Sequence, residues 1–246
     1  MNKQYVIFKD LGTIGYKSAW DYQEELVRRN LNIKSAARSG TLGIIDPALL
    51  PTKHYLLFCE HPPVYTLGKS GSMENVLLNE KEMTDKEIEF FKTNRGGDIT
   101  FHGLQQIVGY PILDLEKFYT DIGKYLRSLE EVIIQTIAEY GLKGERSLGE
   151  TGVWLDPGIK GKERKICAMG IRCSRWITMH GFALNVNTDL SYFNNIIPCG
   201  IQNKQVTSIE KELNKWVDMG EVKEKLLENF KSVFSTEIIS EFFPVH

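Results

Sequence analysis

The most informative stretch of this chain is residues 165–200, KICAMGIRCSRWITMHGFALNVNTDLSYFNNIIPCG. The segment is typical of two strands, 165–173 and 176–187, and it ends in a Pro-Cys-Gly tripeptide. Cys199 stands between a residue of fixed φ and a residue without a side chain, so the turn can present a thiol with little bulk around it.

A cysteine becomes a nucleophile as the thiolate, and a nearby ammonium group favours that form by lowering the thiol pKa. Lys165 supplies such a group if its strand returns beside the turn. Spacing alone leaves this open, because a buried structural cysteine and a solvated lysine are the more common arrangement.

Outside this segment, hydrophobic periodicity predicts helices and strands without strict alternation. Strands are expected at 5–8, 54–60, 64–67, 99–102, 109–115 and 152–156, and Pro111 suggests an edge strand or a bulge. Helices are expected at about 16–31, from a capping box at 84–87 through Phe91, from a Thr120 cap to Gly141, and over 222–233. The mixture predicts an α+β fold in which mixed sheets pack with helices.

Composition narrows the class of protein. An apolar fraction of 42% and a net charge of −2 over 246 residues indicate an ordinary globular protein and argue against general nucleic-acid binding. We expect no membrane span and no signal peptide. The four cysteines lack zinc-site spacing, so we expect no metal, free thiols and a cytoplasmic location. Of these, Cys59, Cys167 and Cys173 are interpreted as small core residues.

Several segments together resemble one family. They are EHPPVYTLG (60–68), RGGDITFHG (95–103), and KICAMG (165–170) continuing to HGFALNVN (180–187) and PCG (198–200). In order and spacing they are similar to the lipoyl(octanoyl) transferases of the biotin/lipoate protein ligase superfamily, over roughly residues 6–208. The resemblance implies one catalytic domain over 1–246, with a possible small helical element from about residue 210.

The resemblance also implies a reaction and a site. The enzyme would take octanoyl from octanoyl-acyl carrier protein, carry it as a thioester on Cys199 with the thiol activated by Lys165, and pass it to a lysine of lipoyl domains. The expected acceptors are the lipoyl domains of 2-oxoacid dehydrogenase complexes and the glycine cleavage H protein, and no cofactor is needed because thioester-to-amide transfer runs downhill. The resemblance places the acyl chain along Arg95, Gly96, Gly97, Asp98, Ile99, Thr100, Phe101, His102, Ala168, Met169, Gly170, Gly181, Phe182 and Ala183.

Some alternatives stay open at this point. The small residues of the predicted site suit an acyl tunnel or plain sheet packing, and His102 and His180 suit proton transfer or the core. The family loop His-Gly-Pro-Gly-Gln reads His-Gly-Leu-Gln-Gln here, which predicts Leu104 facing the acyl channel or core and Gln105 facing solvent. The rival functions are an ATP-dependent ligase of the same fold, although the Gly-Arg-Gly-Arg loop of biotin ligases is missing, and a non-catalytic binding protein.

Overall fold

The computed structural model describes residues 3–44, 46, 49–197 and 205–240. Its strands are β1 (Gln4–Thr13), β2 (His54–Glu60), β3 (Val64–Leu67), β4 (Glu89–Lys92), β5 (Ile99–His102), β6 (Gln106–Ile112), β7 (Val153–Leu155), β8 (Arg164–Ser174), β9 (Ile177–Asn185), β10 (Gln205–Val206) and β11 (Thr236–Ser240). Its α-helices are α1 (Tyr16–Arg38), α2 (Glu80–Asp85), α3 (Ile122–Ala138), α4 (Ile209–Leu213) and α5 (Met219–Phe234), and its 3-10 helices include η3 (Leu115–Lys117) and η4 (Leu190–Asn195).

The large sheet is mixed. Its strand order is β10-β8-β9-β6-β2-β1-β11, with β7 paired to β8. Antiparallel pairs run from β7 through β8, β9 and β6 to β2, whereas β1 lies parallel to both β2 and β11. A small sheet, β4-β3-β5, stands beside it. The α+β fold with mixed sheets packed against helices is therefore confirmed.

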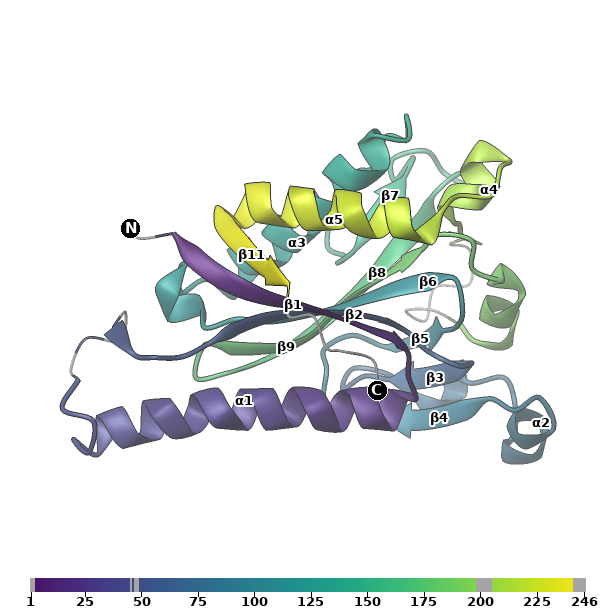
Figure 1. The fold of residues 1–246 in the computed structure, drawn as a ribbon. Coiled ribbons are helices and arrows are strands. Elements are labelled where there is room, and N and C mark those ends of the chain that lie inside the picture. Colours follow the sequence, from purple (N-terminus) through teal and green to yellow (C-terminus); the bar gives the residue numbers. More distant parts are fainter. Residues whose placement is uncertain (1–2, 45, 47–48, 198–204, 241–246) are drawn as a thin grey trace.

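Helices cover both faces of the large sheet, as Figure 1 shows. On β2, Leu56 and Phe58 pack into the cluster formed with α3 and α5, whereas Leu57 and Cys59 pack into the cluster formed with α1. Successive strand residues point to opposite faces, so one continuous apolar run serves both clusters. At the C-terminal end, α5 packs on α3 and β11 pairs with β1.

The predicted helix from the 84–87 capping box through Phe91 is wrong. The capping box is present one turn earlier, where the Asn79 side chain accepts from the Glu82 backbone N–H and the Glu82 carboxylate accepts from the Asn79 N–H. The helix then ends at Asp85, and 89–92 forms β4, parallel to β3. Residues 89–92 form a strand because they pair with β3, more than twenty residues earlier in the chain. A local sequence pattern carries no information about such a distant partner.

Two smaller expectations also need correction. Asp121, and not Thr120, caps α3, because its carboxylate accepts from the Lys124 N–H at 2.9 Å. Pro111 lies in β6, between β2 and β9 and not at a sheet edge. A proline is tolerated there because the pairing with β9 is interrupted after Gly109 and resumes only at the Asp114–Ile177 bridge, so Pro111 needs no N–H on that side.

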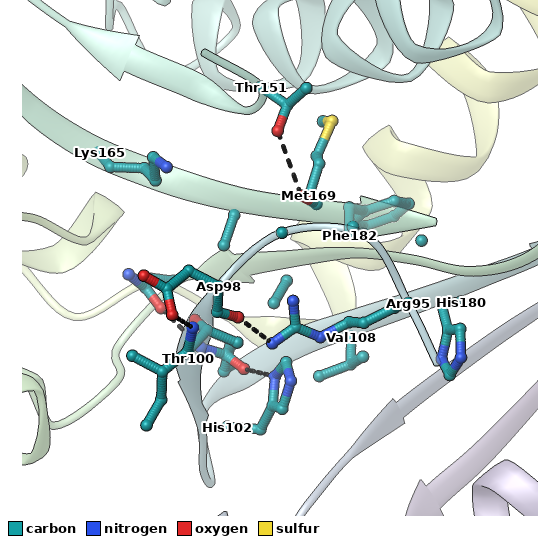
Figure 2. Close-up of a pocket in the computed structure, with 18 of the residues that line it drawn as sticks. Arg95, Asp98, Thr100, His102, Val108, Thr151, Lys165, Met169, His180 and Phe182 are labelled. Atoms are coloured by element: carbon teal, nitrogen blue, oxygen red, sulfur yellow. Dashed lines mark hydrogen bonds between the residues drawn. The ribbon is translucent and has the colours of Figure 1, made fainter. Parts of the chain in front are cut away.

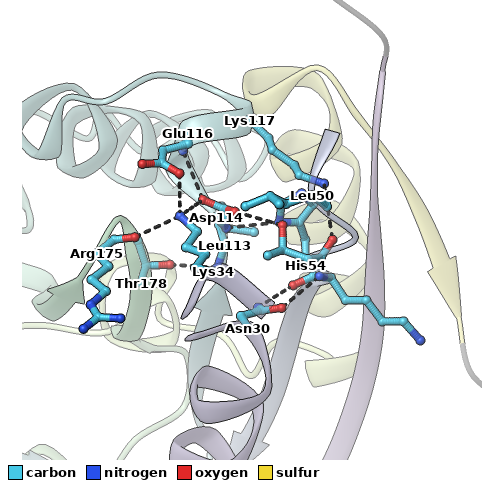
Figure 3. A network of polar contacts seen from close by, with 12 residues as sticks. Asn30, Lys34, Leu50, His54, Leu113, Asp114, Glu116, Lys117, Arg175 and Thr178 are labelled. Atoms are coloured by element: carbon cyan, nitrogen blue, oxygen red, sulfur yellow. Dashed lines mark hydrogen bonds and ion pairs between the residues drawn. The ribbon is translucent and has the colours of Figure 1, made fainter. Parts of the chain in front are cut away.

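Helix α1 runs past the expected end near residue 31 and carries a buried lysine, shown in Figure 3. Lys34 is 3% exposed, and its ammonium donates to Asp114 Oδ1 at 2.5 Å, Glu116 Oε2 at 2.9 Å and the Arg175 carbonyl at 2.9 Å. Asp114 Oδ2 also accepts from the Thr52 hydroxyl at 2.8 Å. One ammonium group thus joins α1 to the end of β6, to η3 and to the β8–β9 turn.

Candidate active site

A cavity lies between the large sheet and the segment that leads from β4 into β5, and Figure 2 shows its lining. Of the residues that the sequence analysis proposed, those that line it are Lys165, Arg95, His102 and the segments 97–100, 168–170 and 181–183. The structure thus brings together segments that are far apart in the sequence. Cys199 lies outside the described residues.

Two of the proposed residues do not line the cavity. Phe101 turns into the core of the small sheet, where its ring stacks on Tyr192 at 4.5 Å between centroids. Gly96 instead joins the loop to the large sheet, since its N–H donates to the Ile171 carbonyl at 2.9 Å.

Other residues that line the cavity were not predicted from the sequence, among them Tyr16, Gln106, Tyr110, Thr151, Asn185 and Val206. Tyr16 begins the helix expected at 16–31, and its ring packs against His61 and Phe91 as well as lining the cavity. No local signal separates such a residue from an ordinary core residue.

Arg95 holds its own loop in shape. Its guanidinium donates to the carbonyl groups of Thr66 at 2.6 Å, Asp98 at 2.8 Å and Gly96 at 3.0 Å, and the residue is only 7% exposed. The Asp98 carboxylate accepts from the Ile99 N–H and from the Asn75 amide, both at 2.7 Å. These charged hydrogen bonds fix the backbone that forms one wall of the cavity.

Gly170 and Gly181 serve close packing as well as the cavity wall. A Cβ atom on Gly170 would lie 2.6 Å from the Gly96 carbonyl oxygen, and one on Gly181 would lie 2.1 Å from that of Gly109. Both distances are too short for any side chain, so these positions let the Arg95 loop and β6 approach the strands. Close packing thus requires both glycines, and their predicted contact with an acyl chain stays a prediction.

His102 is a node in a polar chain. The buried Thr66 hydroxyl accepts from Arg95 at 3.0 Å and lies 3.2 Å from His102 Nε2, while Nδ1 lies 2.9 Å from Gln106 Oε1. The Gln106 amide donates onward to Asn185 Oδ1 at 2.8 Å. Burial, with the positive charge of Arg95 nearby, holds the His102 pKa well below its usual range. His102 is thus a neutral ring with both nitrogens engaged.

Lys165 reaches the cavity from β8, and its ammonium lies 4.5 Å from the centroid of the Trp154 ring. The described chain stops at Ile197, whose N–H donates to the Asn75 carbonyl at 2.9 Å, and resumes in β10, where Val206 pairs with Lys165. Of the described residues nearest to Cys199 on either side, Ile197 and Gln205–Val206, Val206 lines the cavity.

The other three cysteines are poor nucleophiles. Cys59 and Cys167 are fully buried and Cys173 is partly buried, and burial raises the pKa of each thiol. A raised pKa leaves little thiolate at neutral pH. Cys59 and Cys167 are core residues as expected, whereas Cys173 packs at the margin of the core.

The loop 102–106 differs from its expected form. Leu104 is 52% exposed and does not line the cavity, so the expectation that it faces the channel or core is wrong. Gln105 is not free in solvent: its N–H donates to Glu60 Oε2 at 2.7 Å, and its carbonyl accepts from Asn187 and Thr188. It has a φ of 62°, the conformation that favours the glycine of the related loop.

Replacing Leu104 by serine is therefore expected to leave the free energy of unfolding within about 0.5 kcal/mol, because the side chain is exposed. The adjacent change Gln105→Pro is expected to cost about 3 kcal/mol or more, since proline cannot adopt the positive φ and has no N–H for Glu60. Urea unfolding of both variants checks this pair. A large loss in Leu104→Ser, or none in Gln105→Pro, would contradict this account of the loop.

Within 3–44, 46, 49–197 and 205–240, no cluster of His, Cys, Asp or Glu side chains has the arrangement of a metal site. Within the same residues, no helix is long and apolar enough to cross a bilayer.

The family model, the similar sequences and the similar structures all point to lipoyl and octanoyl transfer proteins. Residues 16–231 match the family model "Lipoyl protein ligase A/B catalytic domain". Octanoyltransferases from Christiangramia forsetii and Flavobacterium johnsoniae are 58% and 59% identical to this chain, over 97% of it and 99% and 100% of their own lengths. A bi-partite lipoate protein ligase from Thermoplasma acidophilum, studied with its E2 lipoyl domain, has a similar fold with a TM-score of 0.66 at 17% identity, covering 99% of this chain and 88% of its own.

Proposed function

This chain belongs to the lipoyl protein ligase A/B catalytic domain family and, within it, to the octanoyltransferases, and from this premise we propose how it works. It takes octanoyl from octanoyl-acyl carrier protein, holds it on Cys199 as a thioester, and transfers it to a lysine of a lipoyl domain in lipoate biosynthesis. The observation that carries the proposal is the identity of 58–59% to octanoyltransferases over nearly their whole length.

The proposed reaction has two balanced steps. In the first, the Cys199 thiolate attacks the carbonyl carbon of the octanoyl thioester, and the carrier thiolate leaves. In the second, the neutral amine of the acceptor lysine attacks the Cys199 thioester, an amide forms, the amine loses a proton, and the Cys199 thiolate is regenerated. Each step exchanges one bond to the acyl carbon for another, so neither ATP nor a metal is required.

The cavity suits an acyl chain. Val108, Met169, Phe182 and Ala183 give it apolar walls, and Lys165 stands at one end. We place the reacting carbonyl at the Lys165 end, because the chain that flanks Cys199 is attached there through Val206. The octanoyl tail then extends along β8 and β9, beside 168–170 and 181–183.

The proposal is tested first by intact-mass spectrometry after mixing the protein with octanoyl-acyl carrier protein. One octanoyl adduct is expected, which is lost in Cys199→Ala because no other thiol in the described residues is both exposed and acidic enough to replace it. The matched controls Cys59→Ala, Cys167→Ala and Cys173→Ala are expected to keep the adduct. An adduct that persists in Cys199→Ala would rule out the thioester proposed here.

Replacing Lys165 by alanine is expected to slow acylation about tenfold to hundredfold, because the loss of a nearby ammonium raises a thiol pKa by about one to two units. Lys165→Arg keeps the charge and should keep part of the rate. The alkylation rate of Cys199 with iodoacetamide against pH measures the shift, with Lys162→Ala, an exposed lysine nearby, as the control. An unchanged alkylation profile in Lys165→Ala would show that another group activates the thiol.

The rival function is an ATP-dependent ligase, because the T. acidophilum protein of similar fold is a lipoate ligase. Transfer from octanoyl-acyl carrier protein without ATP, and no use of free octanoate with ATP, is the expected result. The opposite pattern would favour the ligase.

We further propose that residues 1–246 act as one catalytic domain in the cytoplasm, with acceptors among the lipoyl domains of 2-oxoacid dehydrogenase complexes and the glycine cleavage H protein. We propose that the basic segment 160–175 offers an acidic carrier only a small docking surface, because some of its arginines are already paired. Arg164 is paired with Glu212 and Asp156, and Arg172 with Glu24 at 2.7 Å, whereas Lys160 and Lys162 are exposed.

A further inference from the structure

His180 has an unusual backbone conformation for a strand residue. It lies within β9, is 2% exposed, and has a φ of 59°. A non-glycine residue in the left-handed region costs free energy that the surrounding structure must offset, and such residues cluster at functional sites. The side chain lines the cavity.

The hydrogen bonds around His180 define which ring nitrogen carries the proton. The Asn94 amide nitrogen donates to the Glu24 carboxylate at 3.2 Å, so it is the Asn94 oxygen that faces His180 Nε2 at 2.7 Å. Nε2 must therefore be the N–H. Burial, with Arg95 and Arg172 nearby, lowers the His180 pKa to about 3, so the ring is neutral and Nδ1 keeps its lone pair. Nδ1 is buried and has no hydrogen-bond partner among the residues that the structure describes.

A second polar atom without a partner in the described chain belongs to a side chain that binds the His180 backbone. Gln23, on the face of α1 that packs on the sheet, is 1% exposed, and its carbonyl oxygen accepts from the His180 N–H at 3.0 Å. Its amide nitrogen, Nε2, is buried, and within 3–44, 46, 49–197 and 205–240 it has no hydrogen-bond partner. Buried polar groups are almost always paired, so an unpaired acceptor beside an unpaired donor calls for a group that is both donor and acceptor. A hydroxyl or a water is the smallest such group.

The pair lies far from the reacting end of the cavity. His180 pairs with Ile171 on β8, six positions beyond Lys165, which is about 20 Å along the strand at about 3.3 Å per residue. Figure 2 shows Lys165 and His180 at opposite sides of the site, with Arg95 between them. An acyl chain attached at the Lys165 end therefore runs toward His180, but an extended octanoyl chain covers only about half of this distance. A hydroxyl at its tail reaches the pair only when the acyl group enters the cavity more deeply.

We propose that His180 Nδ1 and Gln23 Nε2 form a binding site for one O–H group at the tail end of the acyl cavity. The bound O–H donates to Nδ1 and accepts a hydrogen bond from Nε2. It comes from one of two sources, a buried water or a hydroxyl near the methyl end of the acyl chain. The assignment of the cavity to an acyl chain rests on the proposed function, whereas the O–H site itself does not.

The direct test is a crystal structure of the free protein and one with bound 8-hydroxyoctanoate. An ordered oxygen within hydrogen-bond distance of both His180 Nδ1 and Gln23 Nε2 is expected in each. An oxygen that is part of the ligand identifies the acyl hydroxyl as the source, and a separate oxygen identifies water. A site without an ordered oxygen in either structure overturns the proposal. The free-protein result stands even if carrier-dependent transfer fails, so the two proposals fail separately.

Kinetics separate the two sources in solution. We compare kcat/KM for 8-hydroxyoctanoyl and octanoyl carrier thioesters in the native protein, in Gln23→Met, and in the control Gln135→Met on α3. If the acyl hydroxyl occupies the site, the hydroxyoctanoyl-to-octanoyl ratio falls about tenfold in Gln23→Met, because a hydroxyl buried without its partner loses that much affinity, and stays constant in the control. A ratio that is equal in all three proteins, with an ordered water retained in the native crystal, assigns the site to water. If the three ratios are equal and the crystal shows no ordered oxygen between His180 and Gln23, the proposed O–H site is rejected.

Discussion

Acidification from pH 7 to pH 5 is expected to lower the free energy of unfolding by about 2 kcal/mol for each buried histidine that stays neutral in the fold. His54, His61, His102 and His180 are such residues, and burial is the largest cause in each case. It lowers the pKa of His54 and His180 to about 3 and of His61 to about 4. Together these groups are expected to unfold the protein in mild acid, because total stability is commonly about 5–15 kcal/mol.

The direction of this pH effect follows from the neutral state of the four rings, which at His54 is also needed for a hydrogen bond. His54 Nδ1 accepts from the Asp114 N–H at 3.1 Å, and protonation of that nitrogen would remove the acceptor. Burial disfavours the charged ring, so the folded pKa of each histidine lies below the unfolded value of about 6.5. Stability from these groups is fully present above pH 6.5 and is lost as the pH falls, since the unfolded chain then binds protons that the folded chain does not.

Urea unfolding at several values between pH 5 and 6.5 measures the effect, because most carboxylates stay ionised over that window. The slope of the free energy of unfolding against pH should correspond to the uptake of several protons on unfolding. The His54→Gln change should reduce that number by about one. Gln135→His, which adds a partly exposed histidine on α3, should leave the slope nearly unchanged. A slope of one proton or fewer in the native protein would contradict the neutral, buried state of these rings.

Replacing Lys34 by methionine is expected to lower the free energy of unfolding by about 3–5 kcal/mol. The ammonium is the counter-ion of Asp114, which is 0% exposed. Its removal leaves a buried carboxylate that still accepts from the Thr52 hydroxyl and the Glu116 N–H. The penalty is the cost of an uncompensated buried charge, so it exceeds what the ion pair itself contributes. Urea unfolding at pH 7 measures the loss.

A double variant and a surface control make this result specific. Lys34→Met combined with Asp114→Asn should cost less than the two single changes added together, because the second change removes the stranded charge. Lys17→Met, on the same helix, removes an ammonium whose pair with Asp21 is more than half exposed, and it should change stability by less than about 1 kcal/mol. Equal losses at Lys34 and Lys17 would show that the buried network contributes little.

Local sequence patterns were sufficient for several elements. The strands His54–Glu60, Val64–Leu67 and Ile99–His102 have the bounds expected from their apolar runs, because each run ends at a nearby proline or glycine. The family motifs also indicated most of the cavity wall, since segments 97–100, 168–170 and 181–183 all line it. Where the backbone requires a small residue or a fixed φ, glycine or proline stands at that position and can be recognised in the sequence.

Tertiary contacts decided the remainder. Strand β4 exists through its pairing with β3, and Lys34 is buried because Asp114, eighty residues later, lies opposite it. Leu104 is exposed because Gln105 is bound by residues of other segments.

The polar end of the cavity is formed by Gln23 and His180, which are 157 positions apart in the sequence. Asn94, from a third segment, sets the tautomer of the His180 ring. By itself the sequence determined the fold class, the family and most of the cavity wall. Only the tertiary structure decided which charges are buried, which histidines stay neutral and where an O–H group can bind, because those properties depend on neighbours that the fold, and not the order of residues, brings together.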